Sequence, residues 1–115
     1  MKAAIMFTYT RPAPGREAKA LEAFMDGLTF FGKLAADGKC GEPMVYLAPS
    51  GLGMMIIHGE RETLFEIIGS DDFAKLYTKV TFTTPDIKYE LVSAGETVQE
   101  QMQVWGAVGL ELGYM

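Results

Sequence analysis

Two segments of the chain are apolar on both sides of a period-two pattern, which predicts strands with both faces covered. Residues 3–9 place Ile5 on one face and Met6 on the other. Residues 53–60 alternate in the same way and carry the only histidine of the chain, His58. Edge strands usually carry charged side chains, whereas strands that are buried on both sides do not. We therefore predict that these two strands are central in a sheet.

Apolar residues that recur three and four positions apart predict the helices. The first helix runs from about Glu17 to about Asp37. Its predicted buried stripe comprises Leu21, Phe24, Met25, Leu28, Phe31, Leu34 and Ala35. A second helix covers residues 61–68 and restarts after Ser70, whose hydroxyl can cap the new segment. The predicted buried residues of these two segments are Leu64, Phe65, Ile67 and Ile68, followed by Phe73, Leu76, Tyr77 and Val80.

Two further strands complete the pattern. Residues 44–48 alternate and are joined to the strand at 53–60 by a connector rich in turn-forming residues, so the two strands form a hairpin. Residues 87–92 alternate between apolar and charged side chains, which is typical of a half-exposed edge strand. The order strand, helix, strand, strand, helix, strand predicts an α+β protein with the ferredoxin-like antiparallel sheet and helices on one face. We assign residues 1–94 to this domain.

Residues 95–115 form a C-terminal extension that the ferredoxin-like fold does not require. Its apolar residues recur at helical spacing: Val98, Met102, Trp105, Val108 and Leu112. Gly106, Gly109 and Gly113 weaken an isolated helix. We therefore expect a helical extension that packs on the domain or on its partner.

Two helices cover only one face of such a sheet, so the other face remains apolar and exposed within one chain. We expect that face to carry either Phe7 with His58 or Met6 with Met55. A second copy could stack its sheet there, or the C-terminal helix could fold over it. We favour the second copy, because the glycines make the helix a poor lid and because two closing sheets bury apolar area efficiently. The prediction is a homodimer or a larger homo-oligomer.

Two short features lie at the starts of the predicted helices. The sequence Pro-Gly-Arg-Glu at 14–17 opens the first helix, and Ser-Asp-Asp-Phe at 70–73 restarts the second. Together with the element order, these features make residues 3–93 similar to the dimeric α+β barrel superfamily, which includes antibiotic-biosynthesis-type monooxygenases, haem-degrading enzymes and small isomerases. The resemblance implies sheets paired into a barrel. Haem-degrading members carry a histidine on the second helix, and residues 61–80 contain none, so that activity is not carried over.

The charge and composition of the chain argue against several classes of partner and against a membrane or secreted location. A formal net charge of -5 and a pI near 4.8 argue against nucleic acid, because nucleic-acid modules usually present a basic face. The sequence lacks the long apolar run of a membrane span, and its N-terminal residues lack the features of a signal peptide. One cysteine, Cys40, cannot form an intrachain disulfide. We therefore expect a cytoplasmic protein with no membrane partner.

Candidate chemistry centres on His58. With Glu60 and Glu62 it forms a His-x-Glu-x-Glu pattern that could supply an acid–base pair, because imidazole titrates near neutral pH. A strand-end histidine before the charged start of a helix has the same pattern without any catalytic role. Tyr9 could position a substrate or donate a hydrogen bond to a developing oxyanion. One histidine and one cysteine do not suffice for a two-histidine or deaminase-type metal site, so we predict no metal and no cofactor.

The leading functional hypothesis is a protein that binds a small apolar or aromatic molecule in a cavity enclosed by the paired sheets. The predicted ligand-binding residues are Phe7, Tyr46, Met54 and Ile56. The first alternative is a cofactor-independent monooxygenase or isomerase, with His58 as the proton acceptor and Tyr9 positioning the substrate. The second alternative is a structural or protein-interaction module with the C-terminal helix as its docking surface.

Overall fold

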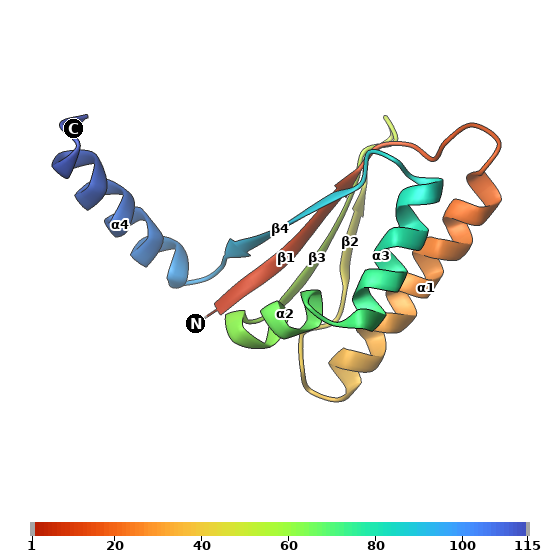
Figure 1. Ribbon diagram of the computed structural model, residues 1–115, viewed down its shortest axis with the longest axis horizontal. Helices are drawn as coiled ribbons and strands as arrows, with labels where there is room; N and C mark the ends of the chain where they lie inside the picture. The colour runs from red at the N-terminus through yellow and green to blue at the C-terminus, as the bar shows by residue number, and fades with distance from the viewer. Residues whose placement is uncertain (1, 115) are drawn as a thin grey trace.

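The structure is a computed structural model that describes residues 2–114, and its elements follow the predicted order. They are β1 (Lys2–Tyr9), α1 (Glu17–Ala36), β2 (Met44–Leu47), β3 (Gly53–Glu60), α2 (Arg61–Ile68), α3 (Asp71–Thr83), β4 (Lys88–Ser93) and α4 (Thr97–Glu111). The strands form one antiparallel sheet in the order β2-β3-β1-β4, with α1 and α3 on one of its faces (Figure 1). The predicted α+β fold and the central positions of the first and third strands are confirmed.

The register between β1 and β3 decides which side chains share a face. Phe7 pairs with Met55, and both point toward the helices, whereas Met6 pairs with Ile56, and both point away. Directly opposed residues of an antiparallel pair always lie on the same side. The expected groupings of Phe7 with His58 and of Met6 with Met55 are therefore wrong. The cause is that a one-residue difference in register moves every side chain to the other face.

We call the side of the sheet opposite to α1 and α3 the outer face. Its residues are Ala4, Met6, Thr8, Met44, Tyr46, Met54, Ile56, His58, Lys88, Glu90 and Val92. Met44 and Tyr46 are exposed, and the other large apolar members are partly exposed. Figure 1 shows no helix of the described residues lying along this face.

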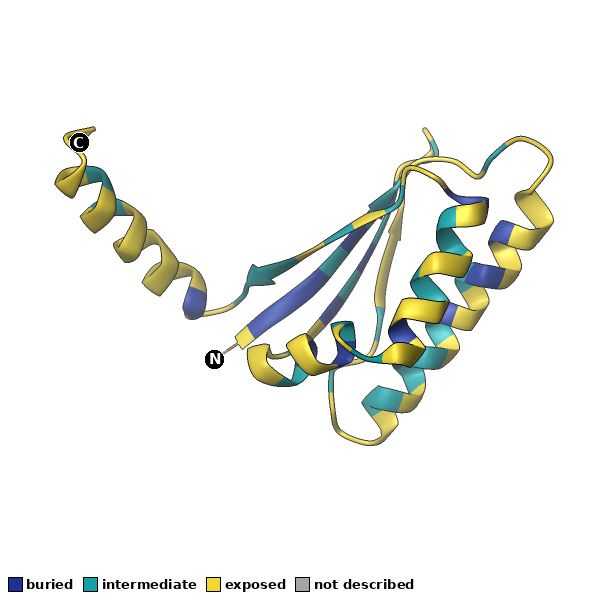
Figure 2. Cartoon of the chain, viewed as in Figure 1, coloured by how far each residue is buried: buried dark blue, intermediate teal, exposed yellow. Residues whose placement is uncertain are grey.

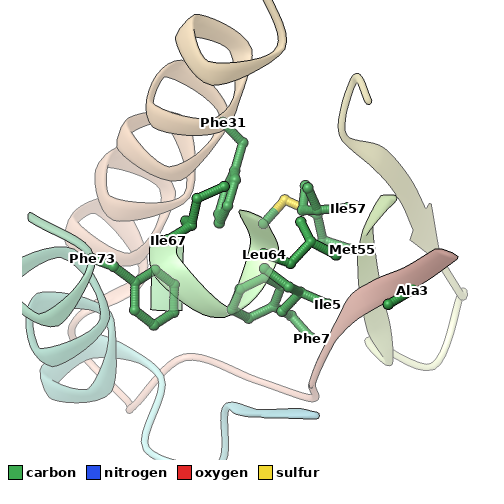
Figure 3. Close-up of a cluster of buried hydrophobic side chains, with 9 residues drawn as sticks. All are labelled: Ala3, Ile5, Phe7, Phe31, Met55, Ile57, Leu64, Ile67 and Phe73. Carbon is green, nitrogen blue, oxygen red and sulfur yellow. The ribbon is translucent and has the colours of Figure 1, made fainter. Parts of the chain in front are cut away.

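The hydrophobic core lies between the sheet and the helices, as Figure 3 shows. Its buried residues are Ala3, Ile5, Phe7, Phe31, Met55, Ile57, Leu64, Ile67 and Phe73. The ring of Phe7 lies 5.8 Å from that of Phe31 on α1 and 6.2 Å from that of Phe73 on α3, measured between centroids. Tilted aromatic pairs of this kind add about 0.5–1.5 kcal/mol beyond the area that they bury. Phe7 thus joins both helices to the central strand.

The buried side of α1 overlaps the predicted stripe in part, because Phe31 is buried and Leu28 and Leu34 pack against the core. The residues that it buries are Ala20, Ala23, Gly27 and Phe31. Leu21 and Met25, which belong to the predicted stripe, are exposed. These small residues lie on the side of α1 that faces the sheet. The predicted stripe of α1 is therefore rotated from the observed one.

Ser70 separates α2 from α3 as predicted. Its Oγ accepts a hydrogen bond from the backbone N–H of Phe73 at 3.2 Å and donates one to the carbonyl of Ile67 at 2.7 Å. This is the N-cap geometry that satisfies one of the free N–H groups at a helix start. Phe65 was expected among the buried residues of α2, but it is exposed, because Leu64 and Ile67 face the core and Phe65 points away from them.

Helix α4 confirms the predicted C-terminal helix and extends away from the sheet (Figure 1). Figure 2 shows it exposed along most of its length, and Thr97 at its start is its buried residue. None of the helices between residues 2 and 114 combines the length and the apolar character that a bilayer crossing requires.

Replacing Leu64 tests how α2 packs. Leu64 is 0% exposed and its neighbour Phe65 is 66% exposed. Leu64→Ala leaves a hole in a closed core, so we expect the free energy of unfolding, measured by urea denaturation, to fall by about 2–5 kcal/mol. Phe65→Ala is the matched control and should change it by less than about 1 kcal/mol. A loss at Phe65 equal to that at Leu64 would mean that α2 buries another side.

Candidate functional site

A cavity of about 430 Å³ lies on the helix side of the sheet, beneath α1 and α3. Phe7 and Met55 of the central strands line it from the sheet, and Ala20, Ala23 and Gly27 line it from α1. A Cβ atom placed on Gly27 would meet no neighbouring atom within 4 Å. The cavity exists because α1 presents small side chains to the sheet at the point where large ones would fill the space.

Aromatic rings form much of the remaining cavity wall. They belong to Phe24 and Phe31 of α1 and to Phe73 and Tyr77 of α3. The Tyr77 hydroxyl donates a hydrogen bond to the carbonyl of Ile87 at 3.0 Å, so its polar end is satisfied. Rings in such a wall can pack edge-to-face or offset-stacked against another ring. The wall therefore suits a flat apolar group.

Tyr9, the last residue of β1, also lines this cavity. It pairs with Gly53 in the sheet, and a Cβ atom on Gly53 would overlap the Tyr9 ring, so the glycine leaves the space in which the ring lies. The Tyr9 hydroxyl oxygen is buried and has no hydrogen-bond partner among the described residues. Such an unsatisfied group costs about 1–3 kcal/mol. Burial also raises the pKa of the Tyr9 phenol, which keeps it protonated at neutral pH.

The cavity meets solvent where its lining residues are exposed, at Arg11, Leu21 and Leu47. The strand end that leads to this mouth is held in place by a side chain from the loop before β4. The backbone N–H of Thr10 donates to Asp86 Oδ2 at 2.9 Å, and the Thr10 hydroxyl donates to the same oxygen. These hydrogen bonds of Thr10 hold the backbone next to Tyr9 in place.

The structure divides the predicted site residues between the two faces of the sheet. Phe7 and Tyr9 line the cavity on the helix side. The others lie on the outer face: Tyr46, Met54, Ile56 and His58. The six residues thus do not form one site within a chain. The expected cavity was placed between paired sheets, whereas the cavity of the single chain lies between the sheet and its own helices.

His58 lies at the opposite end of the sheet from Tyr9. It pairs with Ala4 near the start of β1, whereas Tyr9 pairs with Gly53 at the start of β3. His58 is exposed, and its carbonyl accepts a hydrogen bond from the backbone N–H of Gly41 at 2.7 Å. A substrate held by Tyr9 in the cavity would therefore not reach this imidazole. The role of His58 as a proton acceptor stays a prediction.

The comparisons with known proteins establish the fold. No known family model matches the sequence, and no curated protein matches it. Among solved structures, Rv0793 from Mycobacterium tuberculosis is 17% identical with a TM-score of 0.64, over 83% of this chain and 96% of its own. PA3566 from Pseudomonas aeruginosa is 18% identical with a TM-score of 0.58, over 82% of this chain and 94% of its own.

A third similar structure is a conserved protein of unknown function from Bacteroides thetaiotaomicron VPI-5482, described as a possible oxidoreductase. It is 16% identical with a TM-score of 0.61, over 81% of this chain and 96% of its own. At this level of identity the similarity concerns the fold alone. The three alignments take in nearly all of each neighbour, so this chain carries residues beyond the shared fold.

Two tyrosine substitutions test whether each hydroxyl has a hydrogen-bond partner, because they should change the free energy of unfolding differently. Tyr9→Phe removes a buried group without a partner, so we expect the free energy of unfolding to stay unchanged or to rise by about 1 kcal/mol. Tyr77→Phe removes the donor to Ile87, so we expect a fall of about 1 kcal/mol. Chemical denaturation of both variants gives the comparison. A fall for Tyr9→Phe as large as for Tyr77→Phe would mean that the Tyr9 hydroxyl has a partner in the protein.

Proposed function

We propose that the chain binds a small aromatic molecule with one hydrogen-bonding group in the cavity beneath α1. The observation that carries this proposal is the hydroxyl of Tyr9, a residue that lines the cavity, because this hydroxyl is buried and has no hydrogen-bond partner among the described residues. Buried polar groups in proteins are nearly always paired with protein, water or ligand atoms. A hydroxyl or carbonyl on the ligand would supply the missing partner.

The size and lining of the cavity support the same class of ligand. Its volume of about 430 Å³ falls within the range of roughly 300–1,000 Å³ that is usual for small-molecule sites. Its aromatic wall, with Phe24, Phe31 and Phe73, favours a ring over an aliphatic chain of equal size. Because polar groups in the wall are few, additional polar substituents on the ligand would lose hydrogen bonds to water without replacement.

We favour binding over catalysis because the cavity offers no proton acceptor. Its titratable lining residues among those described are Tyr9, Arg11 and Tyr77. Burial raises the pKa of both phenols, and the neighbouring Tyr89 adds to the rise for Tyr77, so both stay protonated at neutral pH. An arginine does not lose its proton in proteins. General-base catalysis would thus need a group from the ligand or from another molecule.

We also infer that a second copy of the chain covers the outer face, which gives the dimeric arrangement expected from the sequence. Met44, Ile56 and Met6 belong to an apolar group on the three adjacent strands β2, β3 and β1, and no helix of residues 2–114 lies above it. Monomeric proteins rarely leave contiguous apolar patches of more than a few hundred Å² in water. A two-fold axis through this face would cover both copies with the same surface.

A pair of probes that differ by one hydroxyl tests the ligand proposal. We expect 1-naphthol to bind more tightly than naphthalene when both are titrated into the protein and followed by calorimetry. In Tyr9→Phe the advantage of 1-naphthol should fall by about 3- to 10-fold, which corresponds to one net hydrogen bond. The affinity for naphthalene should stay the same, because it makes no use of the hydroxyl.

Filling the cavity gives a second test with a matched control. Gly27→Leu places a side chain in the empty space and should abolish the binding of both probes. Ala18→Leu lies on the opposite, exposed side of α1 and should leave binding unchanged. Failure of the unaltered protein to bind 1-naphthol, or equal binding by Gly27→Leu, would contradict the proposal for this cavity.

A further inference from the structure

Helix α4 exposes apolar side chains that a single chain does not cover. Trp105 is 77% exposed, and Met102, Leu110 and Leu112 are each exposed by more than half (Figure 2). Trp105 is the only tryptophan in the chain. Large apolar side chains gain most when they are removed from water. Beyond its first turn, α4 is therefore left largely uncovered by the other residues between 2 and 114.

Apolar residues occupy only part of the circumference of α4, and the apolar Val104 lies on the side that also carries the acidic residues. At about 100° per residue, Val98, Met102 and Trp105 fall on one side, and Glu100 and Glu111 fall on the other. Gly106 and Gly109 cost the helix about 1 kcal/mol each relative to alanine. A helix of this length with two such glycines is marginal in water by itself. Packing of its apolar side is thus the natural source of its stability.

The connection between β4 and α4 directs the helix away from its own domain. The backbone N–H of Ala94 donates to the carbonyl of Lys2 at 3.3 Å, which continues the pairing of β4 with β1. The N–H of Thr97 then donates to the carbonyl of Ala94 at 3.2 Å, and the Thr97 side chain is buried. Gly95 takes a φ of +60°, a value that favours glycine. In this turn the chain leaves the sheet, and α4 extends away from it (Figure 1).

The chain exposes more surface than a compact monomer of its mass. The chain exposes 7735 Å², whereas a compact monomer of 12.6 kDa exposes about 6,200 Å². Its radius of gyration is 16.4 Å, against about 13 Å for a compact domain of this length. The excess of about 1,500 Å² exceeds the roughly 800 Å² that each partner contributes to an interface of standard size. Each copy has enough surplus surface for a stable dimer.

We infer that α4 is an exchanged arm, whose apolar side packs against a second copy of the same chain. The inference rests on the proposed homodimer and adds α4 to its interface. An element that is exchanged between protomers has an uncovered apolar side and a connection that leads away from its own domain. Helix α4 has both features, and the chain exposes more surface than a compact monomer. Two-fold symmetry gives each copy one arm and one receiving surface, which closes the dimer. Trp105 is then the main contact of the arm.

Sedimentation equilibrium combined with Trp105 fluorescence tests this arm on the full-length chain. We expect the dimer to show blue-shifted tryptophan emission, which moves to the red as the protein is diluted and dissociates. Met102→Glu puts a charge on the apolar side of α4 and should raise the dimer dissociation constant at least tenfold. Ala107→Glu, on the acidic side of the same helix, is the control and should leave both readouts unchanged.

Three other outcomes would contradict the proposal that α4 packs on a second copy. They also distinguish a failure of this proposal from a failure of the proposed dimer. A dimer in which Trp105 emits as in water, and which Met102→Glu does not weaken, would mean that only the sheets meet. Blue-shifted emission from a monomer at every dilution would mean that α4 packs on its own domain. A monomer with water-exposed Trp105 at every concentration would remove the dimer and the arm together, while the 1-naphthol titration would still report on the cavity.

Discussion

Pairing between β1 and β3 places Phe7 and Met55 against the helices and Met6 and Ile56 on the outer face. Both strands are apolar on both sides, so the sheet needs cover on two faces to keep its apolar surface from water. Helices α1 and α3 supply one cover, because each follows a crossover to the same side. On our proposal, the second cover comes from a second copy of the chain. The fold, the cavity and the inferred assembly all follow from this two-sided sheet.

The helix side shows how local side-chain size produces a site. The rings of Phe7, Phe31 and Phe73 pack as a closed cluster, but Ala23 and Gly27 leave the neighbouring space open. Protein interiors normally pack to crystal-like density, so a cavity with a buried hydroxyl lowers stability unless something occupies it. Binding a ligand there would recover dispersion contacts and a hydrogen bond together. On our proposal, the free energy recovered in this way would contribute to the affinity for the ligand.

Sequence patterns predicted where the helices and strands lie along the chain better than they predicted which side of each one is buried. The alternating strands, the Ser70 cap and the C-terminal helix are present as predicted, because each depends on local spacing and local hydrogen bonds. The grouping of Phe7 with His58 was wrong, because register is set by pairing between strands and not by either strand alone. The buried side of α1 was predicted from its large apolar residues alone. The prediction therefore missed Ala20 and Gly27, although these small residues recur at helical spacing.

The same limits explain the candidate site. Tyr9 was expected at a cavity, but its companion His58 lies on the opposite face, since alternate residues of a strand point in opposite directions. Neither the space that Gly53 leaves for the Tyr9 ring nor the missing hydrogen-bond partner can be read from composition or periodicity. Both depend on contacts between strands that are distant in sequence. Sites that arise from incomplete packing need the three-dimensional structure.

Methionine oxidation tests most directly whether a second copy covers the outer face. Met44 on that face is 44% exposed in the single chain, and Met25 on α1 is 53% exposed, so the two should react with peroxide at similar rates in a monomer. Mass spectrometry of the concentrated protein gives both rates in one experiment. We predict that Met44 is oxidised several-fold more slowly than Met25 and that the difference disappears on dilution. Equal rates at high concentration would contradict a covered outer face.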